Sequence, residues 1–178
     1  MVVYCKQFFL SFKIFIFAAF FFAAGSLYSL DGAFVGLSPE ANGNSRQNIA
    51  AGGILSVGFD INDYFSIGFK KAYSADFNGL TVAEDALFFR YYPIVSLGLF
   101  LQADLGTSVF FEENKNILAA ACGLVAGWRF NIGNNFYIEP QARGGYPFIW
   151  GFGINAGARF KTNSQIEKNL ESADIIRR

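Results

Sequence analysis

The stretch SLGLFLQADLGTSVFF, residues 96–111, decides the fold of this chain. Its odd positions, from Leu97 to Phe111, are apolar apart from Thr107. Its even positions are mostly Gly, Ser, Gln and Asp, with Phe100 and Phe110 as exceptions. A period of two places successive side chains on opposite faces of a β-strand. The stretch therefore predicts a long strand with one apolar face and one small or polar face.

The same period runs through residues 50–61, 65–70, 118–132, 136–146 and 150–160. Residues 81–92 fit less well because Asp85 falls on the apolar face, and we expect Asp85 near a rim. A short first strand around Gly32 to Leu37 completes a set of about eight. Short connections at 62–63, 93–95 and 133–135 alternate with longer ones at 38–48, 74–79 and 112–116. The last connection, near 147–149, is shorter than this alternation requires.

Composition narrows the class of protein. Of 178 residues, 53% are hydrophobic and only 16% are charged, against ~25% charged in a typical soluble domain. Lys and Arg number 14, as do Asp and Glu, so no basic excess points to nucleic acid. The chain has no His, which removes Ser/His and Cys/His catalysis and most zinc sites. We expect no enzyme activity, no cofactor and no metal.

Two further kinds of binding site have little support in the sequence. No glycine-rich stretch matches a phosphate-binding loop. Oxygen-bearing residues in the predicted outer loops are compatible with weak Ca²⁺ binding, but solvated loop polarity is the favoured interpretation. These loop residues are Glu40, Asn42, Asn44, Glu112 and Glu113.

The chemistry of the two faces favours a membrane barrel over a soluble sandwich. A soluble sandwich needs a well-solvated outer face, whereas the polar face here is mostly Gly, Ser and Ala. The apolar face is almost free of charge over stretches of about ten residues, which is the length of a membrane-spanning strand. Only a closed sheet satisfies its backbone groups in hydrocarbon. We therefore predict an all-β fold: an eight-stranded antiparallel up-and-down transmembrane β-barrel over residues 30–160, with aromatic girdles at both ends.

Charged residues on the polar face would then point into the lumen, the space that the barrel encloses. We expect these residues to form an ion-pair network that fills the lumen, because unpaired charges there are costly. A narrow conduit or ligand pocket is the alternative. The candidate lumen residues are Lys70, Glu84, Arg90, Asp104, Arg129, Glu139, Arg143 and Arg159.

The two ends of the chain are expected to lie outside the barrel. Residues 1–25 resemble an export signal, with Lys6 and Lys13 before an apolar run, and cleavage as late as residue 29 is a second choice. Cleavage would leave Cys122 without an intramolecular disulfide partner. Residues 161–178 predict a short periplasmic amphipathic helix or a frayed tail, with Ser164 and Glu167 in the pattern of a capping box.

The final strand, GFGINAGARF, and the stretch ALFFRYYP at 86–93 resemble the small OmpA/OmpX/opacity-type group of bacterial outer-membrane barrels. The resemblance implies location in a bacterial outer membrane, contact with its lipid, and recognition of the last strand by the barrel-assembly machinery. The residues of that assembly-signal strand are Gly153, Ile154, Ala156, Ala158 and Phe160. The lipid-deacylating branch of the group uses a His–Ser pair, and a chain without His does not carry it.

Three functions stay open from the sequence. The first is a monomeric barrel with a structural or surface-interaction role, without nucleic acid as a partner. The second is a narrow pore for small solutes. The third is a soluble exported β-barrel or β-sandwich that binds a ligand.

Overall fold

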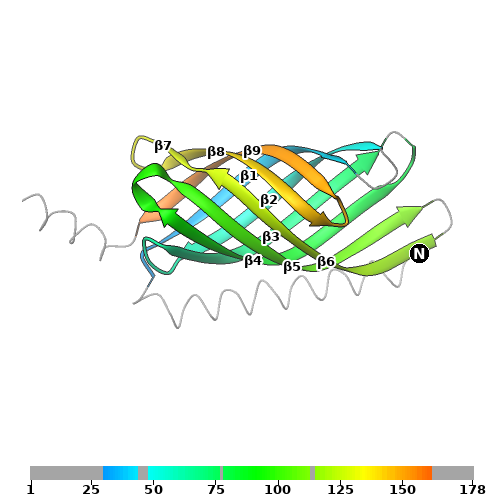
Figure 1. The fold of residues 1–178 in the computed structure, drawn as a ribbon, viewed down its shortest axis with the longest axis horizontal. Helices are drawn as coiled ribbons and strands as arrows, with labels where there is room; N and C mark the ends of the chain where they lie inside the picture. Colours follow the sequence, from blue (N-terminus) through cyan, green and yellow to red (C-terminus); the bar gives the residue numbers. More distant parts are fainter. Residues whose placement is uncertain (1–29, 44–47, 77, 113–114, 162–178) are drawn as a thin grey trace, which may run out of the picture. The chain divides into compact units, whose positions relative to one another are not determined.

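The computed structural model describes residues 30–43, 48–76, 78–112 and 115–161 (Figure 1). Nearly all of these residues lie in strands. The elements are β1 (Gly32–Gly43), β2 (Ile49–Asp60), β3 (Phe65–Asp76), β4 (Thr81–Ile94), the 3-10 turn η1 (Val95–Leu97), β5 (Leu99–Glu112), β6 (Lys115–Trp128), β7 (Phe130–Ile132), β8 (Phe136–Tyr146) and β9 (Trp150–Lys161). Among the residues described, no helix is long and apolar enough to cross a membrane.

The strands form one closed antiparallel sheet. Neighbours in sequence pair in the order β6-β5-β4-β3-β2-β1-β9-β8-β7, and β6 also pairs with β8, which closes the ring. The short β7 continues the line of β6 past Arg129 and pairs with the same strand, β8. The barrel therefore has eight strands around its circumference, because β6 and β7 together occupy one strand position. The predicted up-and-down barrel is confirmed.

The predicted loop lengths are wrong at one end of the barrel. The first strand does not stop at Leu37 but runs to Gly43, and the neighbouring strands also extend into segments that the sequence pattern left as loops. The cause is register: Ser38 to Gly43 pair with Ile54 to Ile49 of β2, so a Pro- and Asn-containing segment is held in the sheet by its partner. Short connections therefore join the strands at both ends.

Two names are used below for the ends of the barrel. The turn end carries the connections at 61–64, 95–98 and 133–135, together with the start of β1 and the end of β9. The loop end carries the connections at 44–48, 77–80, 113–114 and 147–149.

Inward and outward faces follow the period of two. Inward positions are buried, and the fully buried ones include Phe34, Phe100, Tyr137 and Glu139. Outward apolar side chains are exposed instead of packed against a second layer; Leu105, Leu118 and Leu124 are each 70–71% exposed. Glycines on the inward face make room for the buried rings, since a Cβ on Gly58 would lie 2.3 Å from the Phe34 ring. The core is thus the lumen, and the apolar surface is the outer wall.

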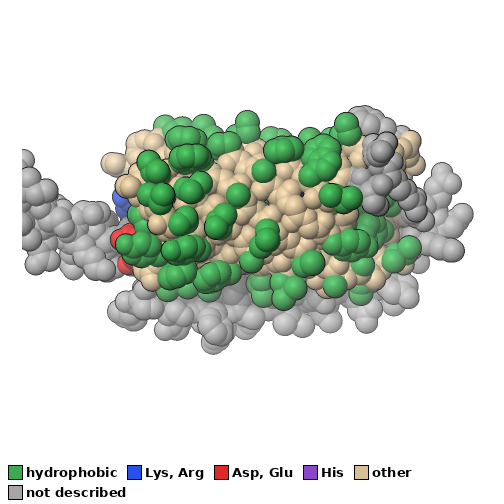
Figure 2. Space-filling view, viewed as in Figure 1, with side chains coloured by type: hydrophobic (Ala, Val, Ile, Leu, Met, Phe, Trp, Pro, Cys, Tyr) green, Lys and Arg blue, Asp and Glu red, His purple; other side chains and the backbone are tan. Residues whose placement is uncertain are grey.

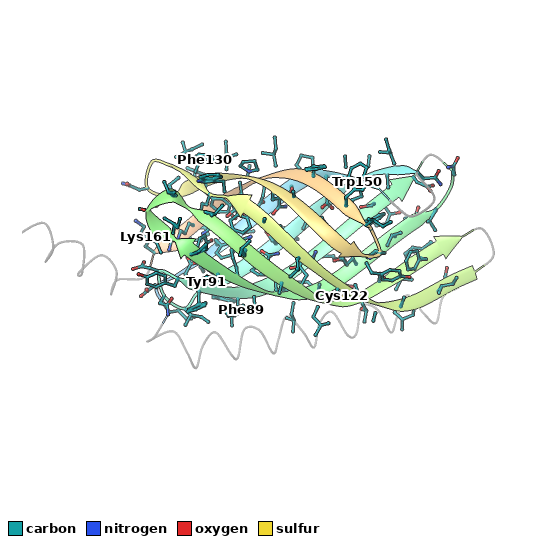
Figure 3. The ribbon with its side chains drawn as sticks, in the orientation of Figure 1. Phe89, Tyr91, Cys122, Phe130, Trp150 and Lys161 are labelled. Atoms are coloured by element: carbon teal, nitrogen blue, oxygen red, sulfur yellow. The ribbon has the colours of Figure 1, made fainter. Side chains whose placement is uncertain are left out.

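The outer wall is apolar along its length. Figure 2 shows hydrophobic side chains spread over the visible wall, with charged side chains in view only at the turn end. Large aromatic side chains lie near both ends: Tyr91 and Phe130 toward the turn end, and Trp150 toward the loop end (Figure 3). Cys122 is a free thiol exposed on the outer wall between them. This distribution is typical of a wall that faces lipid between two interfaces.

The predicted signal segment, residues 1–25 or 1–29, and the tail after Lys161 lie outside the described residues. Both stay predictions. Asn44 and Glu113, two of the residues considered for Ca²⁺ binding, lie outside the described residues as well.

Candidate functional site

The charged interior of the barrel is the candidate site. Near the turn end, Asp60 on β2 accepts two hydrogen bonds. Arg159 Nε on β9 lies 2.7 Å from Asp60 Oδ2, and Ser66 Oγ on β3 lies 2.6 Å from Asp60 Oδ1. Asp60 is fully buried while Arg159 stays partly exposed. These contacts link β2 and β3 to β9, which lies on the other side of β1, at the turn-end mouth of the lumen.

One carboxylate, Glu139 on β8, organises the next layer. Arg90 Nη1 lies 2.8 Å from Glu139 Oε1, and the Nε of Arg129 bonds the same oxygen. The second oxygen, Oε2, accepts a hydrogen bond of 2.8 Å from Asn155 Nδ2. Glu139 is 0% exposed, and both of its oxygens accept hydrogen bonds from protein donors, as a buried carboxylate requires.

Aromatic rings enclose these two arginines. The guanidinium carbon of Arg129 lies 4.5 Å from the Tyr137 ring centroid and 4.6 Å from that of Phe34. The guanidinium carbon of Arg90 lies 4.0 Å from the Phe100 ring centroid. Cation–π contact of this kind stabilises a charge that has lost its water. The layer is therefore held by ion pairs in its centre and by aromatic packing around it.

A second ionic layer lies nearer the loop end. Lys70 Nζ on β3 lies 2.8 Å from Glu84 Oε1 and 2.6 Å from Asp104 Oδ2. Arg143 on β8 reaches Glu84 Oε2 at 2.7 Å and Glu40 Oε2 at 3.4 Å. These contacts join β1, β3, β4, β5 and β8 through side chains that cross the lumen.

An apolar cluster follows at the loop end. Phe148, from the connection between β8 and β9, is 4% exposed and packs with Ala50 and Val82, against which Leu80 and Phe110 also lie. Below this cluster Asn42 Nδ2 donates to Glu40 Oε2 at 3.0 Å and contacts Ser74 Oγ at 3.1 Å. Phe148 thus covers the ionic layer at this mouth of the lumen.

The lumen holds as many carboxylates as cations among the described residues. The carboxylates are Glu40, Asp60, Glu84, Asp104 and Glu139, and the cations are Lys70, Arg90, Arg129, Arg143 and Arg159. A cavity of about 20 Å³ lies between the two ionic layers, lined in part by Lys70, Arg90 and Arg143. That volume is on the order of one water molecule. The interior is accordingly filled by side chains and nearly neutral.

All eight candidate lumen residues lie on the inward face, and each takes part in an ion pair. Sequence reasoning missed two of their partners. Asp60 was on the polar face of the alternation but stood at a strand end, and Glu40 was assigned to a loop. Glu40 and Asn42 instead lie buried inside β1, so they do not form a rim Ca²⁺ site. If the alternation had been continued past Leu37 to Gly43, Glu40 would have fallen on the inward face.

Asp85 also lies elsewhere than expected. It is the fifth residue of β4 and pairs directly across from Lys71 of β3, with Lys71 Nζ 2.8 Å from Asp85 Oδ1. Both side chains are about 30% exposed on the outward face. The outer wall therefore carries a charge pair, away from the rim.

The five residues of the expected assembly-signal strand all lie in β9. Ile154, Ala156 and Phe160 are exposed on the outer wall, whereas Gly153 is half-buried beside β1. Ala158 pairs with Val35 of β1 on one side and with Phe136 of β8 on the other. β9 thus pairs with β1 on one side and with β8 on the other in the finished barrel.

No family model matches the sequence, and no curated protein matches it. Solved structures do resemble the fold. The N-terminal β-barrel domain of Pseudomonas aeruginosa OprF matches with a TM-score of 0.52 and 13% identity, over 74% of this chain and 98% of that one. Neisserial surface protein A matches with a TM-score of 0.51 and 12% identity, over 74% of this chain and 96% of that one. The outer membrane protein OprG of Pseudomonas aeruginosa matches with a TM-score of 0.51 and 11% identity, over 75% of this chain and 98% of that one. The chain therefore has the fold of the small outer-membrane barrels.

Proposed function

We propose that this protein is an integral protein of a bacterial outer membrane with a structural or surface-interaction role. The observation that carries the proposal is the inverted placement of polarity. A one-layer closed sheet exposes Leu105, Leu118 and Leu124 outward while ion pairs such as Arg90–Glu139 are buried inside. Water would disfavour that outer wall, whereas acyl chains suit it.

A filled lumen supports an anchor over a pore. The ion pairs cross the lumen in two layers, and aromatic rings occupy the space beside them, including Phe34, Tyr137 and Phe100. The cavity between the layers has the volume of about one water molecule. A conducting pathway would require several of these paired side chains to move together.

Conductance separates these two functions. The purified protein, refolded into a planar bilayer, should give no unitary currents above the background of the detergent alone. Steady unitary currents that scale with salt concentration would support the narrow pore and reject the filled lumen. A channel-forming porin added to the same bilayer serves as the positive control.

Fractionation separates both from a soluble exported binder. The protein should sediment with outer membranes, resist extraction by alkaline carbonate, and enter solution only with detergent. Its gel mobility should change on heating, because the closed barrel stays folded in cold detergent. Recovery in the aqueous periplasmic fraction would overturn the membrane assignment.

The proposed partners are outer-membrane lipid and, during insertion, the barrel-assembly machinery that reads β9. The protein is proposed to act as a monomer. Phe160, 59% exposed at the turn end of β9, is the residue to vary. Phe160→Ser should slow insertion into proteoliposomes that contain the machinery more than into plain vesicles. Phe136→Ser, on β8 across from Ala158 of β9, is the control and should slow insertion into both equally. If the two variants slowed insertion equally in vesicles with and without the machinery, β9 would not be the signal that the machinery reads.

A further inference from the structure

The cavity between the two ionic layers has an uneven lining. Three charged side chains line it, and all three are cations: Lys70, Arg90 and Arg143. No carboxylate is among the described residues of this lining. The cavity therefore faces positive charge from both layers, since Arg90 belongs to the layer around Glu139 and the other two cations belong to the second layer. The remaining polar groups are hydroxyls and amides, from Ser38, Ser56, Gln102, Gln141 and Asn155.

The three cations still have N–H groups to donate. Arg90 donates through Nε and Nη1, so its Nη2 has no acceptor among the described residues. Arg143 donates through its two Nη atoms, which leaves its Nε without an acceptor in the same part of the chain. Neither nitrogen is completely enclosed by protein atoms. Lys70 Nζ has three hydrogens and contacts two carboxylates. A ligand in the cavity would thus meet free donors from all three side chains.

The carboxylates that pair with these cations lie behind them, away from the cavity. Glu84 bridges Lys70 and Arg143, with contacts of 2.8 and 2.7 Å, but does not line the cavity. Glu40 lies farther away, one inward position beyond the lining residue Ser38 in the direction of the loop end. Because Coulomb energy falls with distance, the nearer cations determine the sign of the potential in the cavity.

The amides of the lining offer few free acceptors to a cation. Gln102 Oε1 accepts a hydrogen bond of 2.9 Å from Arg90 Nε. Asn155 donates through Nδ2 to Glu139, and its Oδ1 lies against the β1 wall at Gly36, where a side chain would collide with it. The lining therefore favours a ligand that accepts hydrogen bonds and carries negative charge.

We propose that this cavity binds one small monovalent anion of the halide type, such as chloride. Its volume of about 20 Å³ is on the order of one water molecule, which is too small for sulfate, phosphate or an organic carboxylate. The layer around Glu139 has two arginines and one carboxylate, so it carries the positive charge that the anion balances. The anion would join two layers that face each other here with like charges.

The anion would be enclosed while the barrel folds. Phe148 covers the loop-end mouth of the lumen, and the Asp60–Arg159 pair lies at the turn-end mouth. A halide held in this way stabilises the interior and does not permeate it. The inference goes beyond the proposed function, because it depends on the lining of the lumen and not on what surrounds the barrel.

The experiment compares salts during refolding. The full-length protein is refolded into lipid vesicles at one ionic strength in potassium chloride, potassium bromide or potassium gluconate, whose anion is too large for the cavity. Urea unfolding is measured in the same salt. We expect chloride and bromide to raise the unfolding midpoint over that in gluconate by about 0.5 M urea or more, and the rise to saturate with halide concentration.

Gln141→Glu tests the site itself. The substitution places a carboxylate in the lining at nearly unchanged volume, where it should take the role of the anion. The variant should be at least as stable in gluconate as the unmodified protein, and the difference between the salts should be lost. Asn134→Asp makes the same change of charge in an exposed turn at the turn end and is the matched control. It should keep the full difference between the salts.

Crystals grown in bromide give a direct measurement that does not depend on a variant. An anomalous peak among Lys70, Arg90 and Arg143 is expected. A water molecule at that place, without an anomalous signal, would overturn the inference. Equal midpoints in the three salts would also overturn it. The same holds if Gln141→Glu folds but is less stable than the unmodified protein in every salt, because a carboxylate in the cavity would then lack the cationic surroundings that we infer.

Discussion

Arg143 on β8 reaches across the lumen to Glu84 on β4, with 2.7 Å between Nη2 and Oε2. The two residues are 59 positions apart in the sequence, and their strands are not neighbours in the sheet. The contact is one that no strand pairing requires, so it depends on barrel closure. It gives a direct way to measure how strongly the ionic interior couples opposite walls.

A double-mutant cycle at this pair should show coupling. Arg143→Met leaves Glu84 with Lys70 as its remaining cationic partner, and Glu84→Gln leaves Arg143 with Glu40 only at 3.4 Å. Buried charges that lose a partner are strongly destabilising. The double variant should lose less unfolding free energy than the sum of the singles, by about 1–3 kcal/mol. Urea unfolding in lipid vesicles measures each variant, and strict additivity would contradict the coupling.

Arg129→Ala should lower the stability of the barrel. The variant removes one of the two cations on the buried oxygen of Glu139 and the stacking on Tyr137 and Phe34. We expect a loss of about 3 kcal/mol, at the lower limit for a broken buried pair because Arg90 remains. Lys161→Ala, at the exposed end of β9, is the control and should leave the unfolding midpoint unchanged. An unchanged midpoint for Arg129→Ala would mean that the pair contributes nothing.

Much of this architecture could be predicted from the alternation alone, because a membrane wall imposes it without interruption. The alternation from Leu99 to Phe111 gave both the strand and its two faces, but the predicted start was wrong: Leu97 ends the 3-10 turn η1 and β5 begins at Leu99. The inward positions of Arg90, Arg129 and Arg143 followed from the same parity. The low content of charged residues indicated which face is outside, because so few charges cannot cover a water-exposed outer surface.

The errors share a physical cause, which is that pairing overrides local preference. Pro39 and Asn42 suggested a loop, yet β2 holds them in a strand, and Glu40 is thereby carried into the lumen. Asp85 was expected at a rim because a lone carboxylate in lipid is costly; its cross-strand partner Lys71 removes that cost. Which residues meet across the lumen, as Arg143 and Glu84 do, depends on the shear of the closed sheet, and the sequence pattern does not report shear.

Phe148→Ala should open the loop-end mouth without creating a conducting pore. The ring is buried against Ala50 and Val82, so its removal should cost about 3 kcal/mol. Two ionic layers still lie beneath it, held by Arg143–Glu84 and Arg90–Glu139. Planar-bilayer recordings should therefore stay silent for Phe148→Ala, as for the unmodified protein. Currents that appear only in the variant would identify Phe148 as a gate and the ionic layers as permeable.

Replacing one member of the outward-facing ion pair Lys71–Asp85 should lower the stability of the barrel more than replacing both. Each side chain is about 30% exposed on the wall, and Leu55 and Thr107 flank the pair in the same row. Lys71→Leu removes the cation that faces the Asp85 carboxylate on a lipid-facing surface, and Asp85→Leu removes the carboxylate that faces Lys71. Each single change should lower stability, more near the bilayer midplane than toward an interface. The double variant, Lys71→Leu with Asp85→Leu, removes both charges and should lie within about 1 kcal/mol of the unmodified protein. Unfolding in vesicles of increasing acyl-chain length makes the test sharper, because the single variants should become less stable as the hydrocarbon thickens while the double variant should not. Single variants that are insensitive to lipid thickness would place this pair outside the hydrocarbon.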